Sequence, residues 1–162
     1  MLCDIIKKMS SKIGNKAVIP NPALKPFEVL LGEWETTGSH PLVPGTVLHG
    51  RESYDWIEGG AFLMRRSEID ESHFPDGIAI FGSDDASKKF FMIYFDERGV
   101  SRKYDVALSE NQIKWWRDDP TFSQRFMLSI EDSGNKMVSK GEMSRDGAAW
   151  EKDLELVYTR IK

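Results

Sequence analysis

Gly32-Glu33-Trp34 and Leu156-Val157-Tyr158-Thr159-Arg160 are the two stretches that decide the fold. The first opens a long run of short segments rich in β-branched and aromatic residues, and the second closes that run almost at the last residue. A sheet that closes into a barrel needs its first and last strands to meet. We therefore predict that Trp34 and Arg160 meet at the closing seam and serve as structural closure, with the guanidinium over the indole.

Turn signals recur between these two stretches at short, regular intervals. They predict an all-β fold, a single antiparallel up-and-down barrel of about ten strands. Just before the barrel, Pro26 to Gly32 is typical of one short helical turn at the N-terminal mouth. We expect residues 1–24 to be a tail or strap and residues 25–162 to be the barrel domain. The clearest turns are Gly59-Gly60, Asp96-Glu97-Arg98-Gly99, Ser109-Glu110-Asn111, Asp132-Ser133-Gly134-Asn135 and Asp146-Gly147.

Composition excludes several classes of partner. The 162 residues carry a formal net charge of −4, and acidic and basic residues are interspersed, so we expect no nucleic-acid and no membrane binding. The single cysteine, Cys3, has no partner thiol, which favours a reducing compartment and a cytoplasmic location. The order of charged and apolar residues in the first ten positions is unlike a secretory signal, and no apolar run approaches the ~20 residues of a membrane span.

Residues opposite one another across a hairpin turn share a face, which allows the interior to be predicted. A two-residue turn at Asp146-Gly147 points four side chains inward, namely Trp150, Leu154, Leu156 and Tyr158. Around the turn at Asp96 to Gly99, the more apolar face carries Phe91, Ile93, Phe95, Arg102 and Tyr104. We predict that this face is interior, and that Phe90, Met92 and Tyr94 lie outside.

The hairpin at Gly59-Gly60 is less decisive. A two-residue turn puts Tyr54, Leu63 and Arg65 on one face, and puts Arg66 and Glu68 on the other. A slip of one residue would exchange the two arginines. Whether Arg65 or Arg66 faces inward stays open, and we retain Arg66 and Glu68 as candidates.

Together with the Gly-x-Trp start, four stretches make the sequence similar to the calycin superfamily of lipocalins, fatty-acid-binding proteins and nitrobindin-like barrels. The resemblance runs from Phe27 to Arg160, is greatest to a bacterial calycin-like family, and implies the barrel but no activity. Fatty-acid-binding proteins hold a carboxylate with Arg-x-Tyr on the last strand. This chain has the opposite order there, so that role is not carried over. The stretches are 56–63 (WIEGGAFL), 94–100 (YFDERGV), 122–126 (FSQRF) and 158–160 (YTR).

Polar side chains inside a barrel of this strand number indicate either a ligand or a mutually satisfied buried network, in which an arginine would pair with Glu68 or Asp55. An error of register would instead leave them on the outer wall. Burying an arginine lowers the stability of the fold unless the guanidinium is paired, hydrated or bound to a ligand. Its planar arrangement of N–H donors suits a carboxylate. We therefore predict that the interior binds a small, partly apolar molecule with an acidic or acceptor group. The candidate ligand-binding residues are Arg102, Tyr104, Trp116, Arg125, Tyr158, Arg66 and Glu68.

Other functions stay open. Tyr104 or Glu68 beside an arginine could carry out acid–base chemistry in the same cavity, and a filled barrel could instead form a homodimer through Phe90, Met92 and Tyr94.

Nothing in the sequence indicates a metal or a cofactor. The histidines His40, His49 and His73 lie in or beside loops, and their spacing is unlike that of a compact metal site. Nitrobindin-like barrels bind haem through a histidine on a late strand. No histidine follows His73, so we expect no haem.

Overall fold

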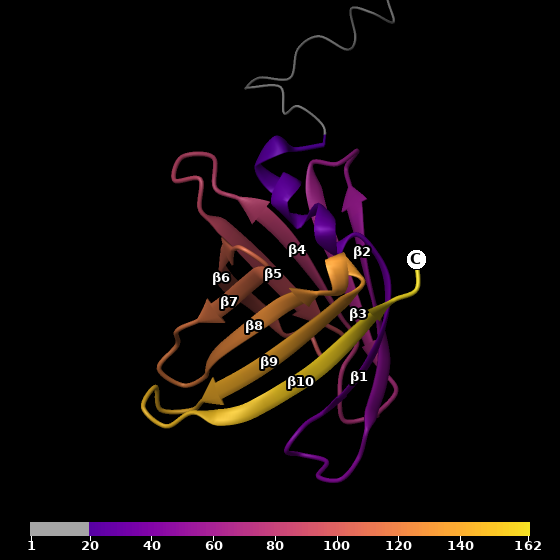
Figure 1. The fold of residues 1–162 in the computed structure, drawn as a ribbon. Coiled ribbons are helices and arrows are strands. Elements are labelled where there is room, and N and C mark those ends of the chain that lie inside the picture. The colour runs from indigo at the N-terminus through magenta and orange to yellow at the C-terminus, as the bar shows by residue number, and fades with distance from the viewer. Residues whose placement is uncertain (1–19) are drawn as a thin grey trace, which may run out of the picture.

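Ten strands follow one another along the chain, and each pairs antiparallel with its sequence neighbours until β10 pairs with β1 and closes a barrel (Figure 1). This computed structural model describes residues 20–162. It confirms the predicted closed ten-strand barrel. The strands are β1 (Gly32–Ser39), β2 (Leu48–Ile57), β3 (Phe62–Ile69), β4 (Gly77–Ser83), β5 (Phe90–Asp96), β6 (Ser101–Ser109), β7 (Gln112–Arg117), β8 (Ser123–Glu131), β9 (Lys136–Ser144) and β10 (Glu151–Arg160), with 3-10 helices η1 (Pro22–Leu30) and η2 (Asp132–Gly134).

The seam between β1 and β10 is fixed by side chains as well as by the backbone ladder. Trp34 lies opposite Arg160 in the register, and the guanidinium carbon is 4.1 Å from the centre of the indole ring. The guanidinium also donates to backbone carbonyls of η2 and of the end of η1, while the indole Nε1 donates to the Leu30 carbonyl at 2.8 Å. The seam therefore also anchors both 3-10 helices.

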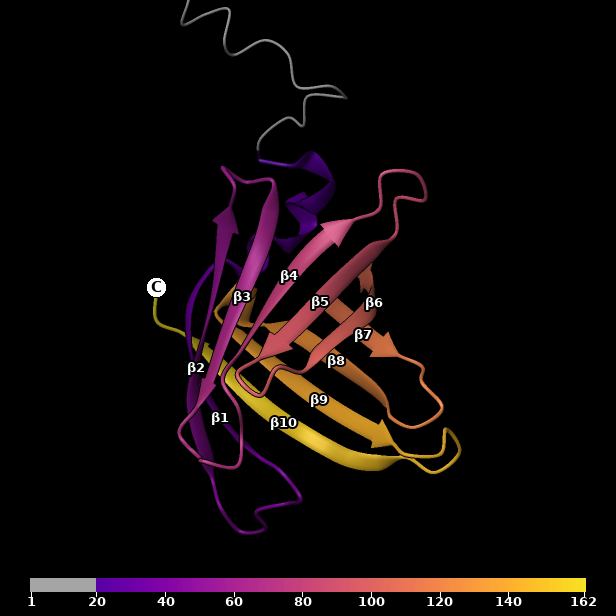
Figure 2. The ribbon, with the colours of Figure 1, turned by 180° about the vertical axis from the view of Figure 1, so that it is seen from behind.

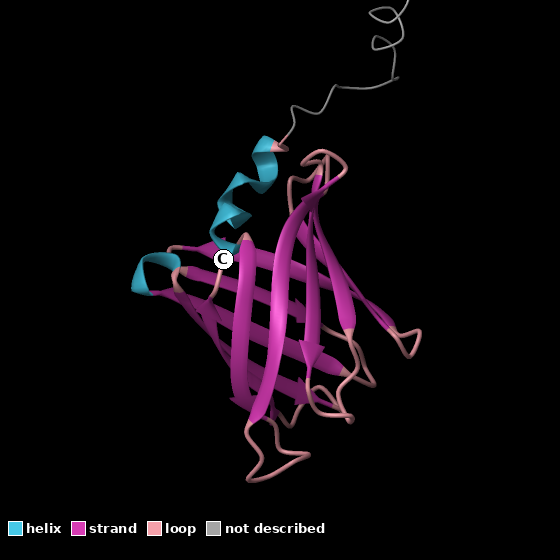
Figure 3. Ribbon diagram, turned by 90° about the vertical axis from the view of Figure 1, so that its right-hand side faces the viewer, coloured by secondary structure: helices cyan, strands magenta, loops and turns pink. Residues whose placement is uncertain are grey.

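Helix η1 plugs one end of the barrel (Figure 3). It begins earlier than the predicted turn, because the Asn21 side chain accepts the Ala23 N–H at 3.0 Å and caps the helix. Its Phe27 is fully buried, with its ring 5.3 Å from that of Phe81 and 5.1 Å from that of Phe90. The predictions for residues 1–19, including Cys3, concern residues outside the described ones.

The predicted face of the β5–β6 hairpin was wrong. Phe95 pairs with Ser101, one residue later than expected, because Asp96 accepts the Arg98 N–H and the connecting loop takes an extra residue. A shift of one residue in the pairing register exchanges the inward and outward faces of β5. Met92 and Tyr94 therefore point inward, together with Phe90, and the outer strip predicted from these three does not exist.

The β9–β10 hairpin is also wider than predicted. Asp146 accepts the N–H groups of Ala148 and Ala149, both at 2.8 Å, and this places Trp150 outside the barrel. An irregularity between Lys152 and Glu155 shifts the register by one further residue and thereby restores the predicted faces, so that Leu156 and Tyr158 point inward as predicted.

Candidate functional site

A cavity of about 310 Å³ occupies the end of the barrel opposite η1. Its walls are the inner faces of the strands, and its rim is formed by the loops that lie at the lower end in Figure 3. Apolar side chains supply much of the surface. They include Ile69, Phe74, Met92, Trp115, Phe126, Leu154 and Leu156.

A polar cluster centred on Glu52 lies deep in this cavity. The Glu52 carboxylate pairs with Arg65 (Nη2 to Oε1, 3.0 Å) and accepts the hydroxyls of Tyr54 at 3.1 Å and Tyr158 at 3.2 Å. Burial raises the pKa of the Glu52 carboxyl, although Arg65 opposes this shift. The Nε of Arg65 is buried and has no partner among the described residues. The Arg65 Nε is therefore shielded from the cavity as well as unpaired within residues 20–162.

A second network lines the cavity nearer the mouth. The carbonyl oxygen of the Gln124 side chain accepts the Tyr104 hydroxyl at 2.5 Å and Arg102 Nη1 at 3.3 Å. Its amide nitrogen donates to Asp153 at 2.7 Å, and Asp153 also pairs with His40 at 2.9 Å. The hydrogen bonds orient Gln124 and leave most of the Arg102 guanidinium available.

His40 is buried, and the prediction that it is a solvated loop residue was wrong. Its Nδ1 accepts the Leu42 N–H at 3.0 Å, so the proton of the neutral ring is on Nε2, which donates to Asp153. The ring also packs edge-on against Phe74, with centroids 5.1 Å apart. His40 therefore ties the β1–β2 and β3–β4 loops to β10 at the rim.

The cavity is richer in cations than in anions, although the whole chain is acidic. Its lining includes Arg65, Arg98, Arg102 and Arg145 but only two carboxylates, those of Glu52 and Asp153. Arg65 is neutralised by Glu52, and Arg98 by Asp96 at 2.7 Å. Within residues 20–162, Arg102 forms no ion pair. It lies 4.5 Å from the centre of the Phe122 ring and is half-buried.

Three of the predicted ligand-binding residues, Arg102, Tyr104 and Tyr158, line this cavity. Trp116 and Arg125 do not, and the prediction that they face the interior was wrong. They lie opposite one another on the outer faces of β7 and β8, because Trp115 and Gln124 take the inward positions. Arg125 pairs with Glu142 at 2.6 Å and lies over Trp150 at 3.9 Å.

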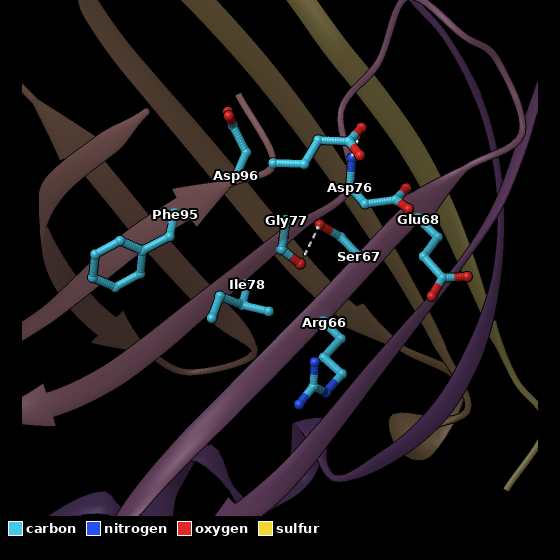
Figure 4. Close-up of a pocket in the computed structure, with 9 residues that line it drawn as sticks. Arg66, Ser67, Glu68, Asp76, Gly77, Ile78, Phe95 and Asp96 are labelled. Carbon is cyan, nitrogen blue, oxygen red and sulfur yellow. Dashed lines mark hydrogen bonds between the residues drawn. The ribbon is translucent and has the colours of Figure 1, made fainter. Parts of the chain in front are cut away.

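Arg66 and Glu68, which were candidates while the inward arginine of this hairpin stayed open, are also on the outer wall, and Arg65 is the arginine that faces inward. The β2–β3 register matches the predicted pairing, but its inward face is the one that carries Tyr54 and Arg65. Figure 4 shows Arg66 on β3 on the side of Ile78 and Glu68 on the same strand on the side of Asp76, with the two charged side chains pointing apart.

Sequence reasoning missed Glu52, Arg65, Gln124 and Asp153. Glu52 had a signal, because it stands two residues before Tyr54 on the same strand and therefore shares its face. No sequence signal marked Gln124 or its partner Asp153. The inward position of Asp153 depends on the irregularity in β10.

Among the residues of the barrel and its plug, 20–162, no three His, Cys, Asp or Glu side chains lie close enough to hold a metal ion. Nor does this part of the chain contain a helix that is long and apolar enough to span a membrane.

Comparison with known proteins supports the fold. The chain is similar to the crystal structure of Rv2717c from M. tuberculosis, with a TM-score of 0.59 and 13% sequence identity over 87% of this chain and 98% of that one. Neither a family model nor a curated protein matches the sequence. At this identity the likeness concerns the barrel and says nothing about a ligand.

Proposed function

We propose that this barrel binds a small, partly apolar molecule through an acidic group, with Arg102 as the anchor for that group. The observation that carries the proposal is a half-buried arginine that lines an open cavity without an anionic partner in the described chain. Such a cation is stabilised when a ligand supplies the missing carboxylate or equivalent acceptor. The cavity volume of about 310 Å³ falls at the lower end of the ~300–1,000 Å³ typical of ligand pockets.

The neighbouring groups suit the same role. The Tyr104 hydroxyl lies beside Arg102 and donates its hydrogen to Gln124 Oε1, and burial raises the pKa of Tyr104, so that the phenol stays protonated and holds Gln124 in place. Deeper in the cavity, Met92 and Leu156 supply apolar contact. We infer that the acidic group binds at Arg102 and that the apolar part packs against these side chains.

We also infer that the chain is a member of the calycin superfamily. The closed ten-strand barrel, the Trp34–Arg160 seam and the fold shared with Rv2717c support this assignment. Lipocalin barrels hold one small ligand in such a lumen, which agrees with the proposed binding.

Recognition is favoured over acid–base catalysis in this cavity. Glu68, one candidate for a catalytic carboxylate, lies on the outer wall. Both oxygens of the buried Glu52 carboxylate are engaged by Arg65 and two tyrosine hydroxyls, which leaves no free basic oxygen directed at a substrate.

The test uses two probes of the same aromatic skeleton, anilinonaphthalene sulfonate and the uncharged phenylnaphthylamine. We expect Arg102→Ala to weaken binding of the sulfonate by at least about tenfold, because a hydrogen bond to a charged group contributes ~1.5–3 kcal/mol. Binding of the uncharged probe should change little. Arg125→Ala, which removes a guanidinium from the outer wall, is the matched control and should affect neither probe.

Fluorescence titration of wild type and both variants gives the affinities. Failure of both probes to bind, or an equal effect of Arg102→Ala on both, would contradict the assignment of Arg102. If the assignment of Arg102 holds, native mass spectrometry of protein purified from its own host identifies the natural ligand.

A further inference from the structure

The outer wall of the barrel is not uniform. Figure 2 faces β3, β4 and β5, which lie side by side and whose outward side chains form what we call the outer apolar face. None of these side chains belongs to the core cluster among the described residues. The outer apolar face consists of Phe62, Met64, Ile78, Ile80, Phe91, Ile93 and Phe95.

The register makes this face continuous. Met64, Ile80 and Ile93 form one row across the three strands, and Ile78 and Phe95 continue the next. Phe91 is laid flat across β4, where a Cβ on Gly82 would come within 2.7 Å of its ring. Phe95 is 37% exposed and Phe62 is 42% exposed, so the apolar side chains of this contiguous face are partly open to solvent.

Polar residues border this face on its sides and at one end. Asp55 on β2 and Lys103 on β6 flank the central row, because they pair with Met64 and Ile93. At the end nearer the cavity mouth lies a hollow whose charged residues are Arg66, Glu68, Asp76 and Glu97, with Asp96 behind them (Figure 4). An apolar centre with a polar border is the anatomy of a protein–protein interface.

The charges at that end select the partner. Arg66, Glu68 and Glu97 are all exposed, and none of them forms an ion pair within residues 20–162, even though they line one hollow. One copy thus offers both an unpaired cation and unpaired carboxylates. A twofold axis that lies in the plane of the interface, parallel to the strands, would bring Arg66 of each copy toward the carboxylates of the other, which is the self-complementarity that an isologous dimer requires.

We propose that the outer apolar face of β3, β4 and β5 is the interface of a homodimer formed by face-to-face packing of two barrels. Arg66 pairs with Glu68 or Glu97 of the second copy, and the Met64–Ile80–Ile93 row forms the buried centre. The cavity mouth is at the end of the barrel and stays open in this arrangement, so the dimer and ligand binding are independent.

The first experiment measures the oligomeric state of the full chain by sedimentation over a wide concentration range. We expect a species of twice the 18.5 kDa chain mass. Ile93→Glu should raise the dimer dissociation constant by at least about tenfold, because the substitution puts a charge at the centre of the interface. Val157→Glu, at a more exposed apolar position on the outer face of β10, is the control and should leave the dimer intact.

A charge exchange tests the orientation. Arg66→Glu alone should weaken self-association, as should the double change Glu68→Lys with Glu97→Lys, because each places like charges together. Mixed in equal amounts, the two variants should form a heterodimer. Circular dichroism confirms that each variant remains folded.

Two results would overturn the proposal. One is a dimer that is insensitive to both Ile93→Glu and the charge exchange. The other is a full-length chain that stays monomeric at every concentration. If, in such a monomer, the thiol of Ile93→Cys in a Cys3→Ser chain were protected from alkylation, the face would be assigned to another segment of the same chain.

Discussion

The plugged end and the open end of the barrel are built from different chemistry on the same ten strands. At the plugged end, Phe27, Phe81 and Phe90 interlock around η1, and the space is filled by apolar side chains. At the open end, Arg102 and Gln124 belong to a hydrogen-bonded network around a cavity. The difference teaches that stability and recognition can be assigned to opposite ends of one barrel axis, and this separation can be tested.

The largest effect is expected at the plug. Phe27→Ala should lower the free energy of unfolding by about 3–5 kcal/mol, because Phe27 is 0% exposed and its loss leaves a cavity against two other rings. Urea denaturation measures the loss. In the absence of urea, where the variant is still folded, its affinity for anilinonaphthalene sulfonate should equal that of wild type. A matching loss of affinity would show that the two ends are not separable.

A smaller effect is expected at the rim of the cavity. Asp153→Ala should cost about 1–3 kcal/mol, because it leaves His40 and Gln124 without their acceptor inside the protein. Unlike Phe27→Ala, it should also alter probe binding, since Gln124 orients Arg102 and Tyr104. Glu155→Ala, on the outer face of the same strand, is the control and should change stability by no more than about 0.5 kcal/mol. Unchanged probe affinity in Asp153→Ala would contradict the role given to this network.

The smallest effect depends on pH. Hydrogen bonds from Arg98 and Tyr94 lower the pKa of Asp96 to about 2 from its usual 3.8. This carboxylate therefore stabilises the fold fully above its unfolded pKa, and the contribution is lost as the pH falls from 3.8 toward 2. Asp96→Asn should cost about 1 kcal/mol at neutral pH, after allowance for the exposure of Arg98 to solvent.

Urea denaturation at several pH values gives the difference in unfolding free energy between wild type and Asp96→Asn. This difference should shrink as the pH is lowered from 3.8 toward 2. A difference that is constant with pH would show that Asp96 acts through packing rather than through charge.

The sequence was sufficient for the barrel and for its seam, because turn residues and the alternation of apolar residues are local signals. It was insufficient wherever a loop adds a residue through its own hydrogen bonds. Asp96 and Asp146 each widen a turn by capping backbone N–H groups, and each displaced the predicted pairing by one position. Within the site, Arg102 was found because a slip that exchanged the faces of β5 left those of β6 unchanged. Asp153 was not found, because nothing local marks the irregularity in β10.

The pairing of Trp34 with Arg160 also has a consequence for biosynthesis. β1 can pair early with β2, but its other edge has no partner until β10 (Glu151–Arg160) has been synthesised. During that interval β1 exposes an unpaired edge, which is open to pairing with other nascent chains. The closing contact also spans most of the sequence, so loop-closure entropy makes it late and slow. Deletion of β10 should therefore open the barrel into a sheet with two unpaired edges. The expected result is aggregation rather than a modest loss of stability.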